Sequence, residues 1–397
     1  MAEVFIAAAV RTPIGKFGGV LKDVAPVDLG AHVIKAALDR SGVSGDDIDL
    51  FIFGNVLRAG FGQLLPRQAA LKAGIPDSVD GYAIDMVCAS GMMSTVNAHN
   101  AIALGDADVV LAGGFESMSQ AAFTISHRAR WGYKTLLGAP EQVADVMVVD
   151  GLTDPMSGEG MGIQTERLAR EYEVTRDQLD QVALWSQQRA LGATEKGVFA
   201  REIAPITLNG KKGPQVVDRD EGIRADTTAQ GLAALRPAFQ KDGVLTPGNS
   251  SQISDGASAL LLASKAAVTK YKLKPIARIL GAAWAAGAGY RFPEAPIPAV
   301  KRLLEKLNMT VADFDLFENN EAYALNSVLF HELLEVPYEK LNVNGGAIAL
   351  GHPLGSSGSR IVVTLLNALA ASGGKRGIAA ICHGTGGATA MAVELVS

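Results

Sequence analysis

Four side chains of this sequence have the chemistry to make and break a covalent bond. Cys88 and Cys382 are the only two cysteines in 397 residues, and Asn320 and His352 lie between them. A thiolate is a nucleophile and can also act as a base, an imidazole can move a proton, and an amide can hold a water or an oxygen without titrating. The cysteines and histidines do not have the spacing of metal ligands. The set therefore predicts covalent catalysis on cysteine.

Cys88 ends an apolar run, and the small residues Ala89, Ser90 and Gly91 follow it before a segment, 92–104, with the pattern of a helix. We expect its thiol to lie between a strand end and a helix start. Backbone N–H groups and the positive end of the helix dipole favour a thiolate at such a place. A small buried hydrophobe is the common alternative for a lone cysteine.

His352 argues against that alternative. It stands between Gly351 and Pro353 in a glycine-rich loop, where neither a helical nor a strand period explains a histidine. Cys382 follows about thirty residues later, at the end of another apolar run and before a glycine-rich turn that contains Gly384. A purely structural role for Asn320 would be that of a helix N-cap, and such a role is compatible with a catalytic one.

Composition limits the possible partners and compartments. The chain is 48% apolar and 19% charged, and its net charge of −5 gives no basic field for nucleic acid. The apolar stretches near 257–263 and 361–371 are too short for a membrane span, and the N-terminal apolar run is too short for a signal peptide. Two cysteines make no disulfide framework. We expect a cytoplasmic protein without nucleic-acid or membrane partners.

Apolar strands alternate with helices in the first third of the chain. This alternation predicts an α/β fold with a mostly parallel sheet covered on both faces. Segment 255–263 fits a helix or a strand. The other expected strands are 4–10, 50–55, 108–112 and 277–283, and the expected helices are 28–41, 67–72 and 92–104.

The composition changes between residues 120 and 248, where prolines, arginines and long loops replace the compact pattern. We predict an inserted lobe at 120–248, a first half at 1–119 with 249–270, and a second half at 271–397. Within the lobe, 175–196 reads as a long helix with Thr175 as its N-cap, and Lys211-Lys212 as a solvated turn. The second half repeats the strand–helix–strand pattern of the first at an interval of about 270 residues. The two halves should therefore be similar and share a site.

The chain resembles the thiolase family over essentially its whole length. The resemblance rests on four ordered motifs: Cys88 in Cys-Ala-Ser-Gly-Met, Asn320 in Asn-Glu-Ala-Tyr, His352 in Gly-His-Pro-Leu-Gly, and Cys382 before glycines. It extends from Val10-Arg11-Thr12-Pro13-Ile14-Gly15 through Gly248-Asn249-Ser250-Ser251. It implies a duplicated five-layer αβαβα fold with an inserted loop lobe.

The resemblance also implies a reaction, the reversible Claisen condensation of two acetyl-CoA to acetoacetyl-CoA and CoA. Cys88 would be the acylated nucleophile activated by His352, and Cys382 the base that removes the α-proton. A water held by Asn320 would serve the enolate together with His352, and the backbone N–H groups of Cys88 and Gly384 would stabilise the tetrahedral intermediate. No cofactor is implied beyond coenzyme A thioesters as substrates, and the assembly would be a homotetramer or a homodimer.

Further residues match the family's substrate contacts. Tyr323 and Phe292 match positions at the acyl pocket, and two rings there favour short acyl chains. Arg224 can meet the phosphate or adenine of CoA, and a solvated arginine is as good an interpretation. The full set implied to bind substrate or CoA is Leu152, Met161, Arg224, Phe239, Ser251, Phe292, Ala322 and Tyr323.

Two departures from the family pattern bear on function. Gly160 stands where a histidine is common, and His383-Gly384-Thr385-Gly386 replaces the usual run of glycines. Other functions remain open: a degradative thiolase for longer chains, a decarboxylating ketoacyl synthase, and a non-catalytic CoA-binding scaffold. Cys382 argues against the synthase, and the presence of Cys88, His352 and Cys382 argues against the scaffold. The first strand is not followed by the glycine pattern of a dinucleotide-binding oxidoreductase.

Overall fold

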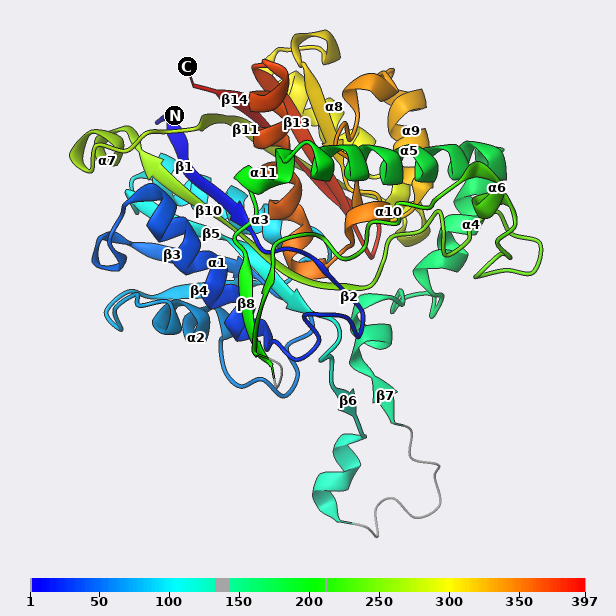
Figure 1. The fold of residues 1–397 in the computed structure, drawn as a ribbon, viewed down its shortest axis with the longest axis horizontal. Helices are drawn as coiled ribbons and strands as arrows, with labels where there is room; N and C mark the ends of the chain where they lie inside the picture. The colour runs from blue at the N-terminus through cyan, green and yellow to red at the C-terminus, as the bar shows by residue number, and fades with distance from the viewer. Residues whose placement is uncertain (1, 133–142, 211–212, 397) are drawn as a thin grey trace.

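The structure is a computed structural model that describes residues 2–132, 143–210 and 213–396. Lys211-Lys212, predicted as a solvated turn, lies outside the described residues. Figure 1 shows the two halves of the chain side by side, with the blue and cyan strands of the first half next to the yellow and red strands of the second.

The main sheet contains ten strands in the order β12-β13-β14-β11-β1-β10-β5-β3-β4, with β2 paired to β10. The two halves meet where β1 and β11 pair through Phe5 and Ile6. The strands are β1 Val4–Arg11, β2 Gly15–Lys16, β3 Leu50–Gly54, β4 Gly81–Ile84, β5 Val109–Ser117, β10 Ser254–Ser264, β11 Ala277–Ala286, β12 Leu316–Asn319, β13 Arg376–His383 and β14 Gly387–Leu395.

The sheet confirms the predicted duplication. The series β3-β5-β10-β1 in the first half corresponds to β12-β13-β14-β11 in the second. Each series has one parallel pair, β3 with β5 and β12 with β13, and antiparallel pairs after it. The ambiguous segment 255–263 is a strand, β10, and its residues are almost all buried.

The prediction of a mostly parallel sheet is wrong. In the part of the chain that the structure describes, only three strand pairs of the main sheet are parallel, β3–β4, β3–β5 and β12–β13. The sequence pattern shows buried strands between helices but not the end from which each strand enters the sheet. The whole lobe separates β5 from β10, so the chain can return antiparallel, and a tight turn joins β13 to β14 as a hairpin.

Helices form three layers around the two halves of the sheet, as the predicted five-layer fold requires. The middle layer is α3 (Ser90–Leu104) and α11 (Leu354–Ser372), which contact each other and both halves of the sheet. One outer layer is α1 (Pro26–Ser41) with α2 (Leu65–Lys72), and the other is α8 (Pro296–Leu307) with α9 (Ala324–Leu334). Figure 1 shows α3 and α11 at the centre of the molecule.

Close packing of the two middle helices brings their N-termini together. A Cβ added at Gly358 on α11 would lie 2.4 Å from the backbone nitrogen of Met92 on α3. Among the described residues, α11 alone is long and apolar enough to cross a membrane, but 83% of its most apolar window is buried inside the structure. The helix is therefore a core element, and its glycine-mediated contact places the turn before α3, which holds Cys88, next to the loop before α11, which holds His352.

The remaining elements lie mostly in the segment between β5 and β10. Thr175 caps α5 with a complete capping box, which confirms that prediction. The elements between β5 and β10 are β6 Phe123–Thr124, η2 His127–Trp131, β7 Ala144–Asp145, η4 Met147–Gly151, α4 Met161–Glu171, α5 Arg176–Glu195, η5 Val198–Arg201, β8 Ile206–Gly210, β9 Gly213–Val217 and α6 Ala229–Ala233. The elements outside this segment are η1 Gly45–Asp47, α7 Lys265–Lys270, η6 Gly289–Glu294, η7 Val311–Asp313, η8 Tyr338–Lys340 and α10 Ala347–Leu350. The three domain boundaries stay a prediction.

Candidate active site

Cys88 lies in a tight turn and not at a strand end, which corrects the expectation from the sequence. The strand β4 ends at Ile84, and α3 begins at Ser90. Val87, just before the cysteine, has φ +47°, a strained conformation for a β-branched residue. The Ser90 hydroxyl accepts the N–H of Met86 at 2.8 Å and donates to the Val87 carbonyl at 2.6 Å. These bonds hold the strained turn that presents the thiol.

Burial dominates the electrostatics of Cys88. The residue is 1% exposed, and burial raises the pKa of its thiol to about 12, against hydrogen bonds from the backbone N–H groups of Gly384 and of Cys88 itself. The expected preference for a thiolate near the helix start is therefore outweighed by desolvation. The Cys88 thiol is therefore protonated near pH 7.

The contacts of His352 fix which of its ring nitrogens carries the proton. Its Nδ1 lies 2.6 Å from the Ser357 hydroxyl, which itself donates to the Pro353 carbonyl at 2.8 Å. The hydroxyl must then accept a hydrogen bond from the N–H of Nδ1, so the lone pair of the imidazole is on Nε2. Burial, with the charge of Arg360, lowers the pKa of His352 to about 3. The imidazole is neutral near pH 7, with Nε2 free to accept a proton.

Asn320 faces the same Nε2. Its Nδ2 lies 3.5 Å from His352 Nε2, and its Oδ1 accepts a hydrogen bond of 3.4 Å from Nη2 of Arg360. Because a guanidinium can only donate, Arg360 fixes the amide with its N–H groups toward the imidazole. The backbone N–H of Asn320 donates to the Ala380 carbonyl on β13, and this bond ties the loop to the strand of Cys382.

Cys382 is fully buried one residue before the end of β13, as predicted for a strand end. Burial raises the pKa of its thiol, and the neighbouring Cys88 raises it further. Nδ2 of Asn326 donates to the sulfur at 3.3 Å and opposes this shift. The sequence did not identify Asn326, Ser357 or Arg360, because each acts through a contact that only folding creates.

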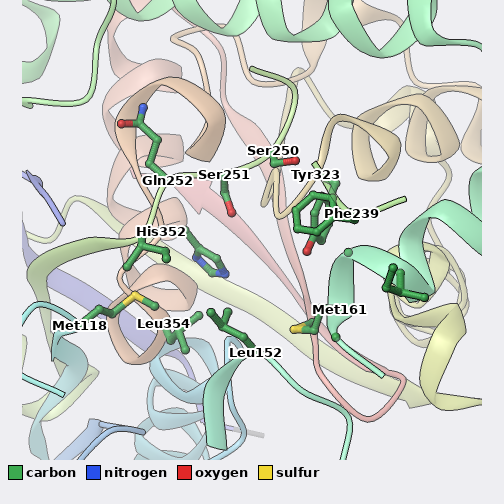
Figure 2. Close-up of a pocket in the computed structure, with 14 residues that line it drawn as sticks. Met118, Leu152, Met161, Phe239, Ser250, Ser251, Gln252, Tyr323, His352 and Leu354 are labelled. Carbon is green, nitrogen blue, oxygen red and sulfur yellow. The ribbon is translucent and has the colours of Figure 1, made fainter. Parts of the chain in front are cut away.

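A mostly apolar pocket of about 230 Å³ opens at His352 (Figure 2), and Cys88, Cys382 and Asn320 are not among the residues that line it. His352 lies on one side of it and Tyr323 with Phe239 on the other. Six of the predicted residues line it: Leu152, Met161, Phe239, Ser251, Tyr323 and His352. Gly160, noted above as a departure from the family pattern, also lines the pocket. The sequence did not identify the seven other lining residues, which are Met118, Gly162, Ile163, Ser250, Gln252, Ile253 and Leu354.

The remaining predicted contacts lie elsewhere. Phe292 and Ala322 are buried in a small cluster with Met161 and Cys382, behind the pocket surface. Phe292 packs against Tyr323 with the ring centres 6.2 Å apart. Arg224 is exposed and is not among the residues that line the pocket. The structure thus places all predicted contacts except Arg224 at or directly behind one apolar pocket.

Two neighbouring cysteines, a neutral histidine and fixed N–H donors on a duplicated α/β fold are typical of enzymes that transfer acyl groups through a cysteine thioester. Comparison with known proteins identifies the family. Residues 4–266 match the family model described as "Thiolase, N-terminal domain", and residues 273–395 match "Thiolase, C-terminal domain". The chain belongs to the thiolase family.

Named relatives match over the whole chain. The chain is 62% identical to the acetyl-CoA acetyltransferase of Synechocystis sp. over 396 residues, covering 100% of both, and 43% identical to that of Escherichia coli, covering 99% of both. The structure superposes with a TM-score of 0.96 on the acetyl-CoA acetyltransferase of Bacillus anthracis at 41% identity. It superposes equally well on human mitochondrial 3-ketoacyl-CoA thiolase at 40% identity; each superposition covers 100% of this chain and 99% of the other.

His383, which departs from the family pattern, lies in the turn after Cys382. Its Nδ1 lies 2.6 Å from the Gly384 carbonyl and donates to it, and a Cβ added at Gly387 would lie 2.2 Å from its Nε2. Thr385, also a departure, adopts φ +70° at the tip of the turn. His383 therefore holds the residue whose N–H reaches Cys88.

We predict that His383→Val changes the acid side of the pH–rate profile. Burial lowers the pKa of His383, so the ring is neutral near pH 7 and takes up a proton only as the pH falls. That proton would charge a buried ring beside Gly384 and disturb its N–H. The acid limb of kcat/KM should move to lower pH in the variant, measured between pH 5 and 9. His331→Val, which removes a histidine that stacks on Tyr338, should leave the profile unchanged. An identical profile for His383→Val and wild type would contradict the prediction.

Proposed function

We propose that this protein is an acetyl-CoA C-acetyltransferase, which reversibly condenses two acetyl-CoA to acetoacetyl-CoA and CoA. The observation that carries the proposal is that two buried thiols, Cys88 and Cys382, are neighbours. The sulfur of Cys88 also accepts a hydrogen bond from the backbone N–H of Gly384. One thiol can carry the acyl group while the other moves the α-proton. The names of the relatives at 62% and 43% identity support the same activity.

In the first half of the proposed reaction, Nε2 of His352 takes the proton of Cys88 as its sulfur attacks the thioester carbonyl. The backbone N–H groups of Cys88 and Gly384 hold the resulting oxyanion. Collapse of this intermediate expels the CoA thiolate, which takes the proton back from His352, a weak base because burial lowers its pKa. The products are acetyl-Cys88, a neutral His352, the Cys382 thiol and free CoA.

In the second half, Nε2 of His352 takes the proton of Cys382, and the resulting thiolate removes the α-proton of a second acetyl-CoA. Protonated His352 and a water held by Asn320 stabilise the enolate oxygen, and the enolate carbon attacks the Cys88 thioester. The Cys88 thiolate leaves and takes back its proton from His352. Acylation of Cys88 removes the possibility of a second negative charge near Cys382, which favours the Cys382 thiolate at the step that needs it.

The pocket favours short acyl chains. Tyr323 packs against Phe292 and Phe239, with ring centres 6.2 Å and 5.9 Å apart. Desolvation raises the pKa of the half-buried Tyr323, and both thiols raise it further, so its ring lies close to the reacting sulfurs. A longer chain at this place would have to displace rings, at a cost of about 1–3 kcal/mol. The alternative is a degradative thiolase for longer 3-ketoacyl-CoA.

The test is CoA-dependent loss of acetoacetyl-CoA absorbance, compared with loss of a ten-carbon 3-ketoacyl-CoA. We expect rapid cleavage of the short substrate and at least about tenfold lower kcat/KM for the long one. The assay is run with and without EDTA, because we propose that no metal or other cofactor is needed. Activity only on the long substrate would favour the degradative alternative, and binding of CoA without any turnover would favour the scaffold.

Gly160 keeps part of the substrate pocket open. Its φ of −65° and ψ of 145° suit any residue, and an added Cβ would meet only the Leu152 carbonyl, at 4.0 Å. The backbone therefore does not require glycine, and a side chain there would occupy the pocket. We propose that this space admits the pantetheine arm of the substrate. Leu152, Met161, Phe239 and Ser251 would contact the CoA part of the substrate, and Arg224 would contact its phosphates.

We predict that Gly160→Val raises KM for acetoacetyl-CoA about tenfold with little change in kcat, because it narrows the pocket without touching the thiols. Gly160→Ala should change KM less than threefold. Gly192→Val, at a helical glycine with open space around its Cβ and outside this pocket, is the matched control for the added side chain. Steady-state kinetics measure the effect, and equal KM values for wild type and Gly160→Val would contradict it.

We also propose a homotetramer, with a homodimer as the alternative, in the cytoplasm. The arm of β6, η2 and β7 projects from the body in Figure 1 and exposes large apolar side chains, with Phe123 68% and Trp131 71% exposed. Such residues commonly mark an interface between chains. Light scattering should give the mass of four chains for wild type and of two for Phe123→Ser/Trp131→Ser. Two chains for wild type would favour the homodimer.

A further inference from the structure

Asn326 on α9 contacts the sulfur of Cys382 and has no role in the reaction as described so far. Its Nδ2 donates to Cys382 Sγ at 3.3 Å and to the Pro293 carbonyl at 3.1 Å. Its Oδ1 accepts the backbone N–H of Tyr323 at 3.0 Å. The side chain is fully buried, so no water competes for these bonds.

The partners of Asn326 leave its amide only one orientation. A carbonyl oxygen such as that of Pro293 can only accept, so it must face the NH₂ end of the amide. The backbone N–H of Tyr323 can only donate, so it must face Oδ1. A flipped amide would lose both bonds and place an oxygen against the sulfur. The N–H that points at Cys382 is therefore a fixed donor.

The backbone around Asn326 is held as well. Its carbonyl accepts a hydrogen bond of 3.0 Å from Nδ2 of Asn319, at the end of β12. Tyr323, which fixes Oδ1, is the residue just before α9 and also lines the substrate pocket. The donor is thus set in place before substrate binds, and little rearrangement is needed when charge forms on the sulfur.

We propose that Asn326 is a further catalytic residue, which stabilises the Cys382 thiolate through its side-chain N–H. This inference rests on the proposed function, in which Cys382 must exist as a thiolate to remove the α-proton. A hydrogen bond to a charged sulfur is stronger than one to a neutral thiol. Among the described side chains, that of Asn326 is the one that donates a hydrogen bond to the Cys382 sulfur.

The test measures the thiolate directly and needs no turnover. In a Cys88→Ser background, Cys382 is the only cysteine, and its alkylation by iodoacetamide at a fixed pH reports its thiolate fraction. We expect Asn326→Leu to slow this alkylation about tenfold or more. Asn326→Asp, which keeps the shape and the bond from Tyr323 but loses the donor, should slow it further. The aspartate variant also decides the question should the leucine variant fail to fold.

Cys88 provides the matched control. In a Cys382→Ser background, alkylation of Cys88 should be the same with and without Asn326→Leu, because the sulfur of Cys88 is bonded by Gly384 and not by Asn326. Equal slowing of both cysteines would mean a general disturbance of the site and would overturn the proposal. Unchanged alkylation of Cys382 would overturn it too.

Catalysis separates this proposal from the proposed function. If wild type cleaves acetoacetyl-CoA but Asn326→Asp leaves kcat and Cys382 alkylation unchanged, only the role of Asn326 fails. If wild type does not cleave acetoacetyl-CoA while Asn326→Asp still slows alkylation of Cys382, the proposed function fails and the hydrogen bond stands. The supporting result is a loss of kcat, with KM nearly unchanged, that parallels the loss of alkylation rate.

Discussion

Replacing Cys88 with alanine is expected to lower kcat for CoA-dependent cleavage of acetoacetyl-CoA by about 10⁴-fold or more. Every step of the proposed reaction passes through a thioester on this sulfur. The turn that presents it, strained at Val87 and held by Ser90, has no second nucleophile at the same position. The loss of acetoacetyl-CoA absorbance measures the effect, and Cys88→Ala activity within about tenfold of wild type would contradict the mechanism.

Cys382→Ala is the informative partner of this variant. It should also stop condensation, but incubation with acetyl-CoA should still place one acetyl group on Cys88, because the nucleophile and its base, His352, remain. Mass spectrometry of the intact protein distinguishes the two: an acetyl adduct is expected for Cys382→Ala and none for Cys88→Ala. An adduct on Cys88→Ala would assign the nucleophile to another residue.

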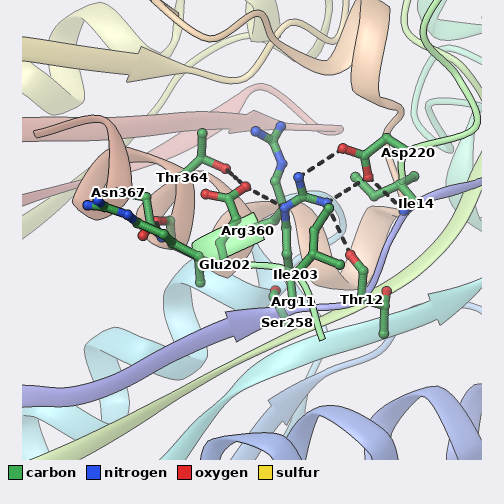
Figure 3. Close-up of polar contacts among 12 residues, drawn as sticks. Arg11, Thr12, Ile14, Glu202, Ile203, Asp220, Ser258, Arg360, Thr364 and Asn367 are labelled. Atoms are coloured by element: carbon green, nitrogen blue, oxygen red, sulfur yellow. Dashed lines mark hydrogen bonds and ion pairs between the residues drawn. The ribbon is translucent and has the colours of Figure 1, made fainter. Parts of the chain in front are cut away.

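Arg11→Met is expected to lower the free energy of unfolding by about 3–5 kcal/mol. Arg11 is fully buried and donates to both carboxylate oxygens of Asp220, at 2.7 and 2.8 Å, and to Glu202 at 2.6 Å (Figure 3). Burial alone would lower its pKa, but the two carboxylates outweigh burial and raise it. Removing the guanidinium leaves two buried carboxylates without their counter-ion.

The cluster around Arg11 joins parts of the chain that are far apart in sequence. Asp220 also accepts the backbone N–H of Ile14, and Glu202 accepts the hydroxyl of Thr364 on α11. Its loss should therefore loosen the segment between β5 and β10 from the core. Urea unfolding followed by fluorescence measures the effect. Arg11→Met/Glu202→Gln/Asp220→Asn should recover part of the stability, because it removes the stranded charges. A triple variant less stable than Arg11→Met would contradict this account.

Much of the candidate site could be read from residue types. Cys88, His352 and Cys382 are chemically distinctive and stand next to glycines and other small residues, so the sequence marks them as candidates. Asn326 and Arg360 are equally close to the chemistry, yet no local pattern marks an asparagine or an arginine inside an apolar helix. Their roles depend on partners such as Cys382 and Asn320, which are far away in the chain.

The fold shows the same division. Buried strands, the capped helix after Thr175 and the duplication are properties of local pattern, and the structure has them. Strand direction depends on the route of the connections, and the prediction of a mostly parallel sheet was wrong for that reason. The helix end beside Cys88 favours a thiolate, but burial by the whole molecule raises the pKa of the thiol.

The sequence by itself determined which atoms can react: two thiols, one imidazole and the glycines that let backbone N–H groups approach them. Tertiary structure decided what those atoms are at rest. Burial keeps Cys88 and Cys382 protonated and His352 neutral, Ser357 sets the position of the imidazole proton, and Asn326 points one N–H at Cys382. Desolvation and hydrogen-bond direction depend on everything packed around a group, so they cannot be read from its neighbours in the chain.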